Sequence, residues 1–388
     1  SQYEQFNDAL NCFDQMRSEG FHPDAITFVF VLKACGNIGA IDKGRLIHDE
    51  IMSMGFLEKN VELGTALVDM YAKCGVLVKA YQVLKELPHR DVVSWNALIA
   101  GCNQYGKAHD ALECFGKMQG DGVSPDAVTF TCILKACKTI EAIDNGEKIY
   151  DEIVARGLLD KNVVLGTALV DMFAKCGCIR EAQKVFDELP VRNVVSWNAL
   201  MCGYAQQGRG DEAVNCFCKM KDEGITPNSI TFICILKVCS NMGSLELGKE
   251  IHNEVCKQGL LKKDIVIGTA LVDMYAKCGV LVKAQEVLTK MTHRDTVAWN
   301  ALIARYVQHE HDHEALDCFA PMQKEGLSPN EVTFLCTLKG CGAIGAIDKG
   351  EEIHDEIVRG GFLEKTIGLG TSLVDMYAKC GALAKARK

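Results

Sequence analysis

Residues 92–101 have the sequence VVSWNALIAG, and two later stretches share its spacing of apolar residues: AVTFTCILKAC at 127–137 and VVLGTALVDMFAKCG at 163–177. From Trp95 the apolar residues Leu98, Ile99 and Cys102 follow at i+3, i+4 and i+7, the spacing of one face of an amphipathic helix. A second such pattern follows Gly106, which marks a turn. The stretch therefore predicts a helical hairpin, with helices near 94–105 and 109–119.

The hairpin pattern recurs along the whole chain with a period of 102 residues, marked by Trp95, Trp197 and Trp299. Each period divides into segments of 35, 36 and 31 residues. Hairpins of this size cannot bury an apolar face alone and must stack on their neighbours. We therefore expect an all-α protein, an α-solenoid with one continuous core and no separate domains.

The repeat boundaries follow from the same spacing. The segments are 1–24 (incomplete), 25–60, 61–91, 92–126, 127–162, 163–193, 194–228, 229–264, 265–295, 296–330, 331–366 and 367–388 (incomplete). Both ends cut through a segment, and neither an initiator Met nor a leader stands at Ser1. We expect the chain to be a fragment of a longer array whose targeting segment is absent.

The composition excludes several classes of protein. The 388 residues are 48% hydrophobic and 24% charged, which argues against disordered and low-complexity chains. No apolar run approaches the roughly 18 residues that span a bilayer, so we expect no membrane partner. The net charge of −9 argues against a surface that coats polyanions generally, and limits any nucleic-acid contact to a local basic strip.

The cysteines and histidines follow the repeat and do not predict a metal centre or catalysis. One cysteine per helix at a fixed offset predicts small core residues in a reducing compartment rather than converging zinc ligands. The motif His-x-Glu is half of a zinc-deaminase signature, but no proline is followed by Cys, so the other half is missing. We expect these histidines, and the His-rich turn 309–313, to be solvated, and we expect no metal, no cofactor and no catalytic residue. The positions concerned are Cys35, Cys137, Cys239 and Cys341; Cys74, Cys176, Cys278 and Cys380; and His48, His252 and His354.

Polar residues recur at two further places, the fifth and the last residue of a segment. N-capping explains the last residues well, because Asp and Asn satisfy free amides at a helix start. It explains the fifth residues poorly, since Ser94 and Thr129 occupy what the sequence indicates as better cap positions. The fifth residues are Asn96, Asn198 and Asn300, and Thr65, Thr167, Thr269 and Thr371; the last residues are Asp91, Asp126, Asn193, Asn228, Asp295 and Asn330.

The whole chain resembles the pentatricopeptide repeat family, and specifically its PLS subclass. WNALIAG followed by ALECFGKM resembles the 35-residue P motif, TFxxxLKAC the 36-residue L motif and GTALVDMYAKCG the 31-residue S motif. The resemblance implies a right-handed superhelix of helical hairpins. Tetratricopeptide repeats share the hairpin, but their uniform 34-residue period does not alternate in this way. A protein-binding scaffold of that type stays open as the alternative function.

The resemblance implies sequence-specific binding of single-stranded RNA, with one base read by the fifth and last residues of each P or S repeat. The implied target of repeats 61–366 is 5′-G-U-x-A-Y-x-G-Y-x-3′, with the L repeats as weakly selective spacers. The implied pairs are Thr65 with Asp91 (G), Asn96 with Asp126 (U), Thr167 with Asn193 (A), Asn198 with Asn228 (pyrimidine), Thr269 with Asp295 (G) and Asn300 with Asn330 (pyrimidine), and Thr371 belongs to the incomplete last repeat.

Two further groups of residues belong to this expected interface. The resemblance implies that apolar second residues clamp the bases: Val93, Val164, Val195, Val266 and Val297. Lysines eight positions after the fifth residue, two turns along the same helix, are expected to contact phosphates: Lys73, Lys175, Lys277 and Lys379. A second set of lysines lies in the L repeats, four positions after the fifth residue of each: Lys33, Lys135, Lys237 and Lys339.

The family resemblance also implies the cellular role. It suggests the recognition tract of a C-to-U RNA-editing factor of mitochondria or chloroplasts. A deaminase-type carboxy-terminal domain or editing co-factors absent from this chain would supply the chemistry, so the chain itself is expected to be no enzyme.

Overall fold

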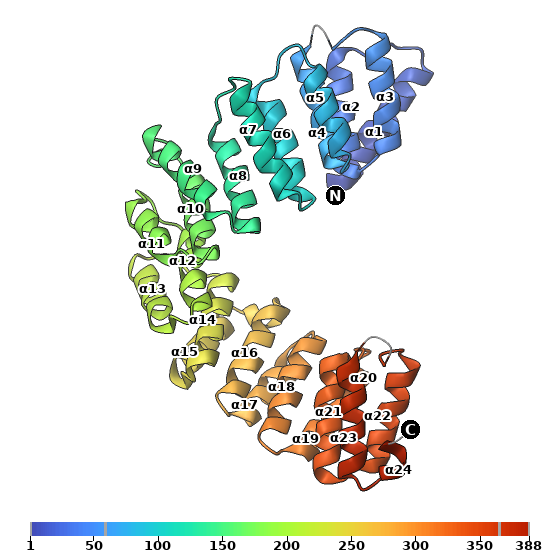
Figure 1. Ribbon diagram of the computed structural model, residues 1–388, viewed down its shortest axis with the longest axis vertical. Helices are drawn as coiled ribbons and strands as arrows, with labels where there is room; N and C mark the ends of the chain where they lie inside the picture. The colour runs from blue at the N-terminus through green and yellow to red at the C-terminus, as the bar shows by residue number, and fades with distance from the viewer. Residues whose placement is uncertain (1, 58–59, 364–365, 387–388) are drawn as a thin grey trace. The chain divides into compact units, whose positions relative to one another are not determined.

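The computed structural model describes residues 2–57, 60–363 and 366–386, which form helices, turns and loops (Figure 1). The predicted fold class, an all-α solenoid of stacked helical hairpins, is confirmed. The helices group into two compact units, Ser1–Gly203 and Tyr204–Lys388, here called the N-terminal and C-terminal units. No helix in the described ranges combines the length and the apolar character needed to cross a membrane.

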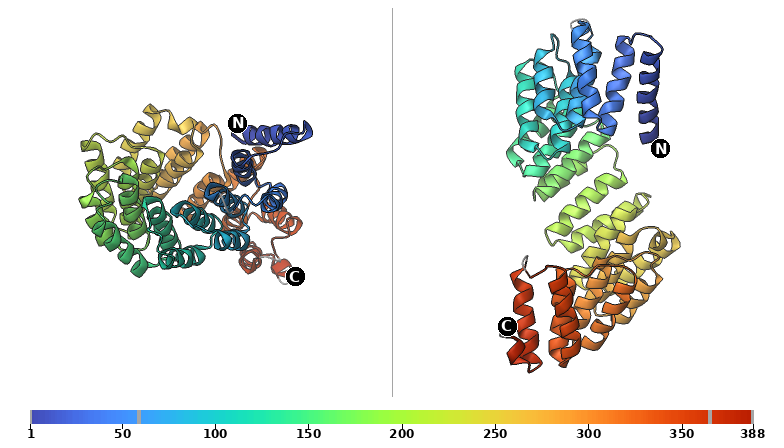
Figure 2. Two further views of the ribbon diagram at one scale, coloured as in Figure 1. Left: turned by 90° about the horizontal axis from the view of Figure 1, so that it is seen from above. Right: turned by 90° about the vertical axis from the view of Figure 1, so that its right-hand side faces the viewer.

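In the N-terminal unit, consecutive helices pack as hairpins, and the views of Figure 2 show them side by side. Its helices are α1 (Gln2–Ser18), α2 (Ala25–Ile38), α3 (Ile41–Ser53), α4 (Val61–Lys73), α5 (Leu77–Glu86), α6 (Val92–Gln104), α7 (Ala108–Gly120), α8 (Ala127–Ile140), α9 (Ile143–Ala155), α10 (Val163–Lys175), α11 (Ile179–Glu188) and most of α12 (Val194–Gln206).

The C-terminal unit repeats this arrangement. Its helices are α13 (Gly210–Asp222), α14 (Ser229–Met242), α15 (Leu245–Lys257), the 3₁₀ turn η1 (Leu260–Lys262), α16 (Ile265–Lys277), α17 (Leu281–Lys290), α18 (Thr296–Gln308), α19 (Asp312–Asp317), α20 (Phe319–Lys324), α21 (Glu331–Ile344), α22 (Ile347–Arg359), α23 (Ile367–Lys379) and α24 (Leu383–Ala386). The first helix of each hairpin begins at the first residue of a segment that the sequence defines, for example at Val92 and Thr296.

Within each unit the first helices pack on one another and form a continuous row. In the N-terminal unit α4 packs between α2 and α6, and in the C-terminal unit α16 packs between α14 and α18. Small residues permit the close approach. A Cβ atom built on Gly101 of α6 would lie 2.7 Å from the Ala72 Cβ and 3.2 Å from the Ala72 backbone of α4. The fixed backbone of α4 therefore requires glycine at this position.

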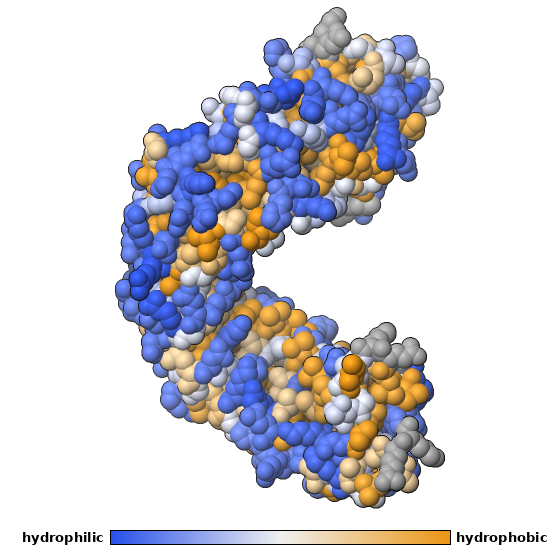
Figure 3. Space-filling model, viewed as in Figure 1, coloured by the Kyte–Doolittle hydropathy of each residue, from blue (hydrophilic) through white to orange (hydrophobic). Residues whose placement is uncertain are grey.

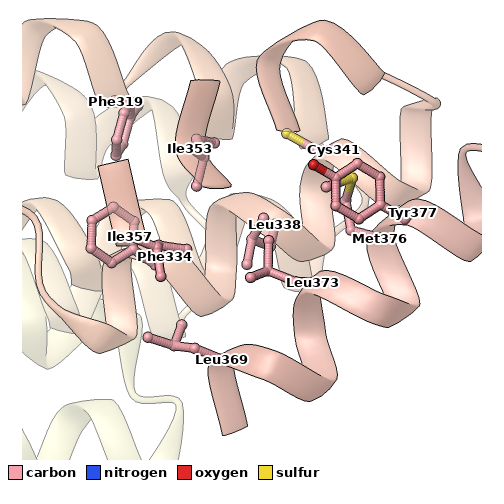
Figure 4. Packing of buried hydrophobic residues seen from close by; sticks show 10 residues of the cluster. All are labelled: Phe319, Phe334, Leu338, Cys341, Ile353, Ile357, Leu369, Leu373, Met376 and Tyr377. Atoms are coloured by element: carbon pink, nitrogen blue, oxygen red, sulfur yellow. The ribbon is translucent and has the colours of Figure 1, made fainter. Parts of the chain in front are cut away.

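The apolar faces of the hairpins form the core between neighbouring repeats. In the C-terminal unit Phe334, Leu338 and Cys341 of α21 meet Leu369 and Tyr377 of α23, as Figure 4 shows. Each fully buried Leu, Ile or Phe side chain stabilises the fold by about 1.5–3 kcal/mol. Because the contacts in this cluster lie between adjacent hairpins, a single hairpin would leave them exposed.

The cysteines of the first series are core residues, as the sequence predicts. Cys35, Cys137, Cys239 and Cys341 are fully buried, and all 20 cysteines are free thiols. Burial raises the pKa of Cys35 to about 11 and that of Cys239 to about 12. These thiols therefore stay protonated and pack as small apolar side chains.

The helix starts differ by two residues from the sequence-based expectation. The predicted helix near 94–105 begins at Val92, because Asp91 and not Ser94 is its N-cap. Ser94 occupies the third helical position, and its side chain completes a capping box with Asp91. The sequence offered two side chains that can cap, and only the backbone geometry decides between them.

The histidines of the His-x-Glu motif are not solvated, so that prediction is wrong. His48 is 5% exposed, and its Nδ1 lies 2.9 Å from the Tyr71 hydroxyl oxygen. The same pair recurs as His252 with Tyr275. The partner comes from the next hairpin, 23 residues away, and the motif itself does not reveal it. Among the described residues no group of three His, Cys, Asp or Glu side chains converges as metal ligands would.

The His-rich turn is solvated only in part. Its histidines His309, His311 and His313 are exposed, as predicted, whereas Asp312 is 8% exposed at the start of α19. Burial raises the pKa of Asp312 above its ordinary value. The turn therefore buries its aspartate, whose Oδ1 has no hydrogen-bond partner among the described residues, and leaves its imidazoles in solvent.

Replacing Gly101 by Val should lower the free energy of unfolding by about 1–3 kcal/mol, because the larger side chain meets the backbone of α4. Urea unfolding followed by helical circular dichroism measures the effect. Gly116→Ala is the matched control. Gly116 lies on the exposed face of α7 with nothing within 4 Å of a Cβ, so alanine there should stabilise by up to about 1 kcal/mol. Equal effects of the two substitutions would contradict the close packing of α6 on α4.

The buried histidines should make stability depend on pH. Burial is the main cause that lowers the pKa of His48. The unfolded chain, with a histidine pKa of about 6.5, therefore takes up protons first as the pH falls. The contribution of His48 is fully present above about pH 6.5 and is lost as the pH falls through its lowered folded pKa.

The second period supplies a variant that removes this dependence. There Tyr150 and Phe173 replace the His–Tyr pair, and the Tyr150 hydroxyl donates to Glu188 at 2.8 Å. The double variant His48→Tyr, Tyr71→Phe should therefore lose less in melting temperature than the parent protein between about pH 7.5 and about pH 5.5. The single variant Tyr71→Phe keeps the histidine and should keep the steeper loss. Identical pH profiles for the parent and the double variant would refute the assignment.

Candidate nucleic-acid interface

The last residues of the P and S repeats cap the first helices of the repeats that follow them. Asp91 accepts a hydrogen bond from the Ser94 backbone amide at 2.8 Å, and Asp126 accepts one from the Thr129 amide at 2.8 Å. The capping explanation of the last residues is therefore correct. The remaining last residues accept amide hydrogen bonds in the same way: Asn193, Asn228, Asp295 and Asn330.

In two P repeats the fifth residue contacts the last residue directly. Asn96 Nδ2 donates to Asp126 Oδ1 at 3.0 Å, and Asn96 Oδ1 accepts a hydrogen bond from the Thr129 hydroxyl at 2.7 Å. The C-terminal unit repeats this geometry. There Asn300 Nδ2 donates to Asn330 Oδ1 at 2.9 Å, and the Thr333 hydroxyl donates to Asn300 Oδ1 at 2.7 Å. The two positions singled out in the sequence therefore meet at the start of the following helix.

The S repeats differ in how the fifth residue is bonded. The Thr269 hydroxyl donates to the Ile265 carbonyl at 2.9 Å and lies 3.3 Å from Asp295 Oδ1. The buried hydroxyls of Thr65 and Thr167 have no hydrogen-bond partner among the described residues. The exposed Thr371 donates to the carbonyl of Ile367 at 3.3 Å. A buried hydroxyl without a partner costs about 1–3 kcal/mol, which a water or a ligand recovers.

The fifth residues lie deeper than side chains on an open surface. Asn96, Asn198 and Asn300 are only 9%, 5% and 8% exposed, and Thr167 is 8% exposed. An asparagine amide has two N–H donors and two acceptor lone pairs. Within the described chain Asn96 uses one N–H on Asp126 and one lone pair on Thr129. One donor and one acceptor of Asn96 are therefore still available to a ligand.

Asp126 is ionised at neutral pH. Burial raises its pKa, but hydrogen bonds from the backbone amide of Thr129 and from Asn96 hold the pKa below its ordinary value. The carboxylate therefore only accepts hydrogen bonds, whereas an asparagine at this position both donates and accepts them.

The predicted stacking valines are all exposed, although they are apolar. Val93, Val164, Val195, Val266 and Val297 are between 53% and 66% exposed. Each lies three positions before the fifth residue, hence on the same side of its helix. Apolar surface patches among the hydrophilic ones are visible in both units (Figure 3).

The L repeats carry exposed apolar residues at the same offset, which the sequence analysis did not assign. The sequence contains a signal for them, because the second residue of each L repeat is apolar, whereas the fifth residues of these repeats vary and predict weakly selective spacers. The four side chains are Ile26, Val128, Ile230 and Val332. The apolar series thus runs through P, L and S repeats alike.

The two sets of lysines differ in their ion pairing. In the first set Lys73, Lys277 and Lys379 pair with an aspartate one turn earlier, at 2.8, 2.7 and 2.7 Å. Lys175 is exposed without an ion pair in the described chain, because the corresponding Asp171 pairs with Lys138. Every lysine of the L-repeat set is exposed and has no ion pair within the described ranges: Lys33, Lys135, Lys237 and Lys339. These L-repeat lysines are the less neutralised cations.

Models of one repeat family match the chain along its length. The model described as the PPR repeat family matches residues 90–139, 192–241 and 294–343, and that of the PPR repeat matches residues 65–92, 167–194 and 269–295.

Three curated relatives are pentatricopeptide repeat-containing proteins of Arabidopsis thaliana. The protein At3g05240 is 34% identical over 388 residues, which cover 98% of this chain and 68% of the relative. The mitochondrial protein At3g02330 is 36% identical, covering 100% of this chain and 44% of the relative. The chloroplastic protein At1g11290 is 34% identical, and the alignment covers 98% of this chain and 46% of the relative. The chain thus spans less than half the length of the latter two.

Solved structures share the fold. The crystal structure of the pentatricopeptide repeat protein PPR10 from maize aligns with a TM-score of 0.69 at 22% identity, covering 98% of this chain and 60% of that one. PPR10 in complex with an 18-nt psaJ RNA element aligns with a TM-score of 0.67 at 19% identity, covering 99% and 59%. Stacked hairpins, repeat models along the chain and a relative 34% identical across nearly all of it lead to one conclusion: the chain belongs to the pentatricopeptide repeat family.

Proposed function

We propose that this chain binds single-stranded RNA sequence-specifically, with one base read by the fifth and last residues of each P or S repeat. The observation that carries the proposal is the contact between these residues, Asn96 with Asp126 and Asn300 with Asn330. Two polar side chains joined by a hydrogen bond form one unit with a defined pattern of donors and acceptors. A base edge placed over them meets that pattern as a whole.

The surroundings of these pairs support the same function. An exposed valine stands three positions before five of the seven fifth residues, whereas Glu62 and Gly368 stand before Thr65 and Thr371. An apolar surface beside a polar one suits a flat base with a polar edge. Base stacking contributes about 1–3 kcal/mol per base. The L-repeat lysines, exposed and without ion pairs in the described chain, are the cations that we assign to the phosphates, together with Lys175. PPR10, whose fold this chain shares, has been solved with an RNA element.

We further infer that the repeats follow the PLS pattern and that the chain serves as recognition tract of a C-to-U RNA-editing factor in a mitochondrion or chloroplast. Relatives with mitochondrial and chloroplastic names support the location. A deaminase-type carboxy-terminal domain or separate editing co-factors would supply the chemistry. The proposed target of repeats 61–366 is 5′-G-U-x-A-Y-x-G-Y-x-3′.

A gel-shift titration tests the function. An RNA that carries G-U-x-A-C-x-G-C-x should bind at least about tenfold more tightly than a scrambled RNA of the same composition. Each mismatched base costs about 1–3 kcal/mol, and 1.4 kcal/mol is a factor of ten. Equal affinity, or no binding of either RNA, would favour a protein-binding scaffold instead.

The substitution Asp126→Asn tests the register of the code. The ionised Asp126 can accept a hydrogen bond from uracil N3–H, whereas Asn can donate one to cytosine N3, so the preference at the second base should move from U toward C. Asparagine caps a helix as well as aspartate does, so the melting temperature should not change. Binding assays with the four RNAs that differ only at this base measure the preference.

Asp110→Asn is the matched control for this substitution. It removes the same charge from the exposed first turn of α7 in the same repeat, away from the paired residues, and should leave the base preference unchanged. An Asp126→Asn protein that keeps its preference for U would show that the assignment of this repeat to the second base is wrong.

A further inference from the structure

A cavity of about 290 Å³ lies between the second helices α5 and α7 of the N-terminal unit, away from the paired reading residues. Its wall comes from α5, from the loop after it, from the first helix α6 and from the end of α7. The lining residues that matter chemically are Tyr81, Lys85, Arg90, Trp95, Lys117 and Asp121.

The indole of Trp95, a residue of the cavity wall, holds an unsatisfied donor. Trp95 is 2% exposed, and its buried Nε1 has no hydrogen-bond partner in the described chain. Buried indole N–H groups normally find a partner. Leaving a buried donor unpaired costs about 1–3 kcal/mol, so a bound group that accepts this hydrogen bond is favoured.

The corresponding tryptophan of the C-terminal unit, Trp299, has the hydrogen-bond acceptor that Trp95 lacks. Trp299 Nε1 donates to Glu325 Oε2 at 3.1 Å, and Arg294 pairs with the same glutamate. At the position of Glu325 the earlier repeat has Asp121, which pairs with Arg90 at 2.7 Å. The aspartate is shorter by one methylene group and leaves the Trp95 N–H unpaired.

The cavity is also positively charged, in a chain whose net charge is −9. Its lining holds three cations, Lys85, Arg90 and Lys117, against one carboxylate, Asp121. Glu113 pairs with Lys117 at 2.6 Å from outside this lining, whereas Lys85 has no ion pair in the described chain. With Arg90 paired to Asp121 and Lys117 to Glu113, Lys85 is the cation of this lining whose charge is left to attract an anion.

The other repeats show that this chemistry is not a consequence of the fold. In the C-terminal unit Gln285, Thr289 and Pro321 stand where this cavity has Tyr81, Lys85 and Lys117. In the intervening 102-residue period, Asp187 stands at the position of Lys85. The unpaired indole of Trp95 and the extra cations occur together in the hairpins 61–126. Two independent changes, one that frees a donor and one that adds charge, therefore meet at a single cavity.

We propose that this cavity binds a phosphate group, with the Trp95 N–H and the Lys85 and Lys117 ammonium groups as donors. A phosphomonoester carries about −1.5 to −2 charges at pH 7 and several acceptor oxygens, and so matches several donors and an excess of cations better than a carboxylate does. The phosphate comes from a small phosphomonoester or from the backbone of RNA. The second source depends on the function proposed above, and the first does not.

Indole N–H signals in a ¹H–¹⁵N spectrum of the full chain test this site, because the chain has three tryptophans and so three such signals. Trp95→Phe assigns the Trp95 signal. Inorganic phosphate is titrated against chloride of equal ionic strength, and the predicted-site RNA is titrated separately. We expect the Trp95 signal to shift saturably, while the Trp197 and Trp299 signals keep their positions during the phosphate titration.

Two variants separate the contributions. Asp121→Glu reproduces the arrangement of Trp299 with Glu325, so the Trp95 signal should move toward that of Trp299 and lose its response to phosphate. Lys85→Gln keeps the free indole but removes a cation, and should weaken the response. Both residues lie outside the paired reading positions, so neither variant should change the affinity for RNA if the phosphate is that of a small molecule.

The outcomes distinguish the sources. A saturable Trp95 shift with inorganic phosphate that Asp121→Glu abolishes supports a small phosphate ligand. A saturable shift with RNA alone that Asp121→Glu abolishes supports a backbone phosphate. No Trp95 response to either probe, or a linear response equal in Asp121→Glu, would overturn the proposal and leave a water molecule as the partner of the indole. A failure of RNA binding alone refutes the proposed function and leaves the phosphate titration as an independent result.

Discussion

A side-chain N-cap joins one hairpin to the next at nearly every first helix, with α23, which starts after Thr366, as the exception. The last residue of one repeat accepts the free amides of the next helix, as Asp126 does from Thr129. A lost cap costs about 0.5–2 kcal/mol, and here it would also release the junction between two hairpins. In P repeats the same cap oxygen accepts the fifth-residue amide, so Asn96 is fixed by the packing of two repeats. Stability and the proposed recognition therefore share one carboxylate.

This sharing explains why Asn96 and Asn300 are buried although the proposed function assigns them to a ligand. A side chain that is held by the cap of the next helix loses less conformational freedom when it binds a base, because it is already ordered. The exposed valines of the first helices contribute differently. Any base that covers a valine adds binding free energy by stacking, whereas the asparagines add binding free energy only when the base presents a matching hydrogen-bonding edge. Affinity and selectivity thus come from different positions of one helix.

The repeats also act as internal comparisons, since the same position recurs with different side chains. Trp299 has Glu325 as its partner and Trp95 has none in the described chain. The pair His48–Tyr71 becomes Tyr150–Phe173 in the next period and keeps an edge-to-face contact. Such pairs show which features the fold requires and which belong to one repeat. The histidines are part of the packing, whereas the charged cavity beside Trp95 is local.

The hairpins, their period and the fold class can be predicted from the amino-acid sequence, because apolar spacing and turn glycines act over a few residues. The resemblance to the repeat family pointed to the valines of the second position, and these side chains are exposed. Three features follow from the packing of the folded chain: Asp91 rather than Ser94 caps its helix, Asn96 bonds to Thr129, and Asp69 neutralises Lys73. The tertiary structure alone shows that His48 is buried on Tyr71. Hydrogen bonds and ion pairs depend on tenths of an ångström between side chains that packing brings together, and no spacing along the chain specifies those distances.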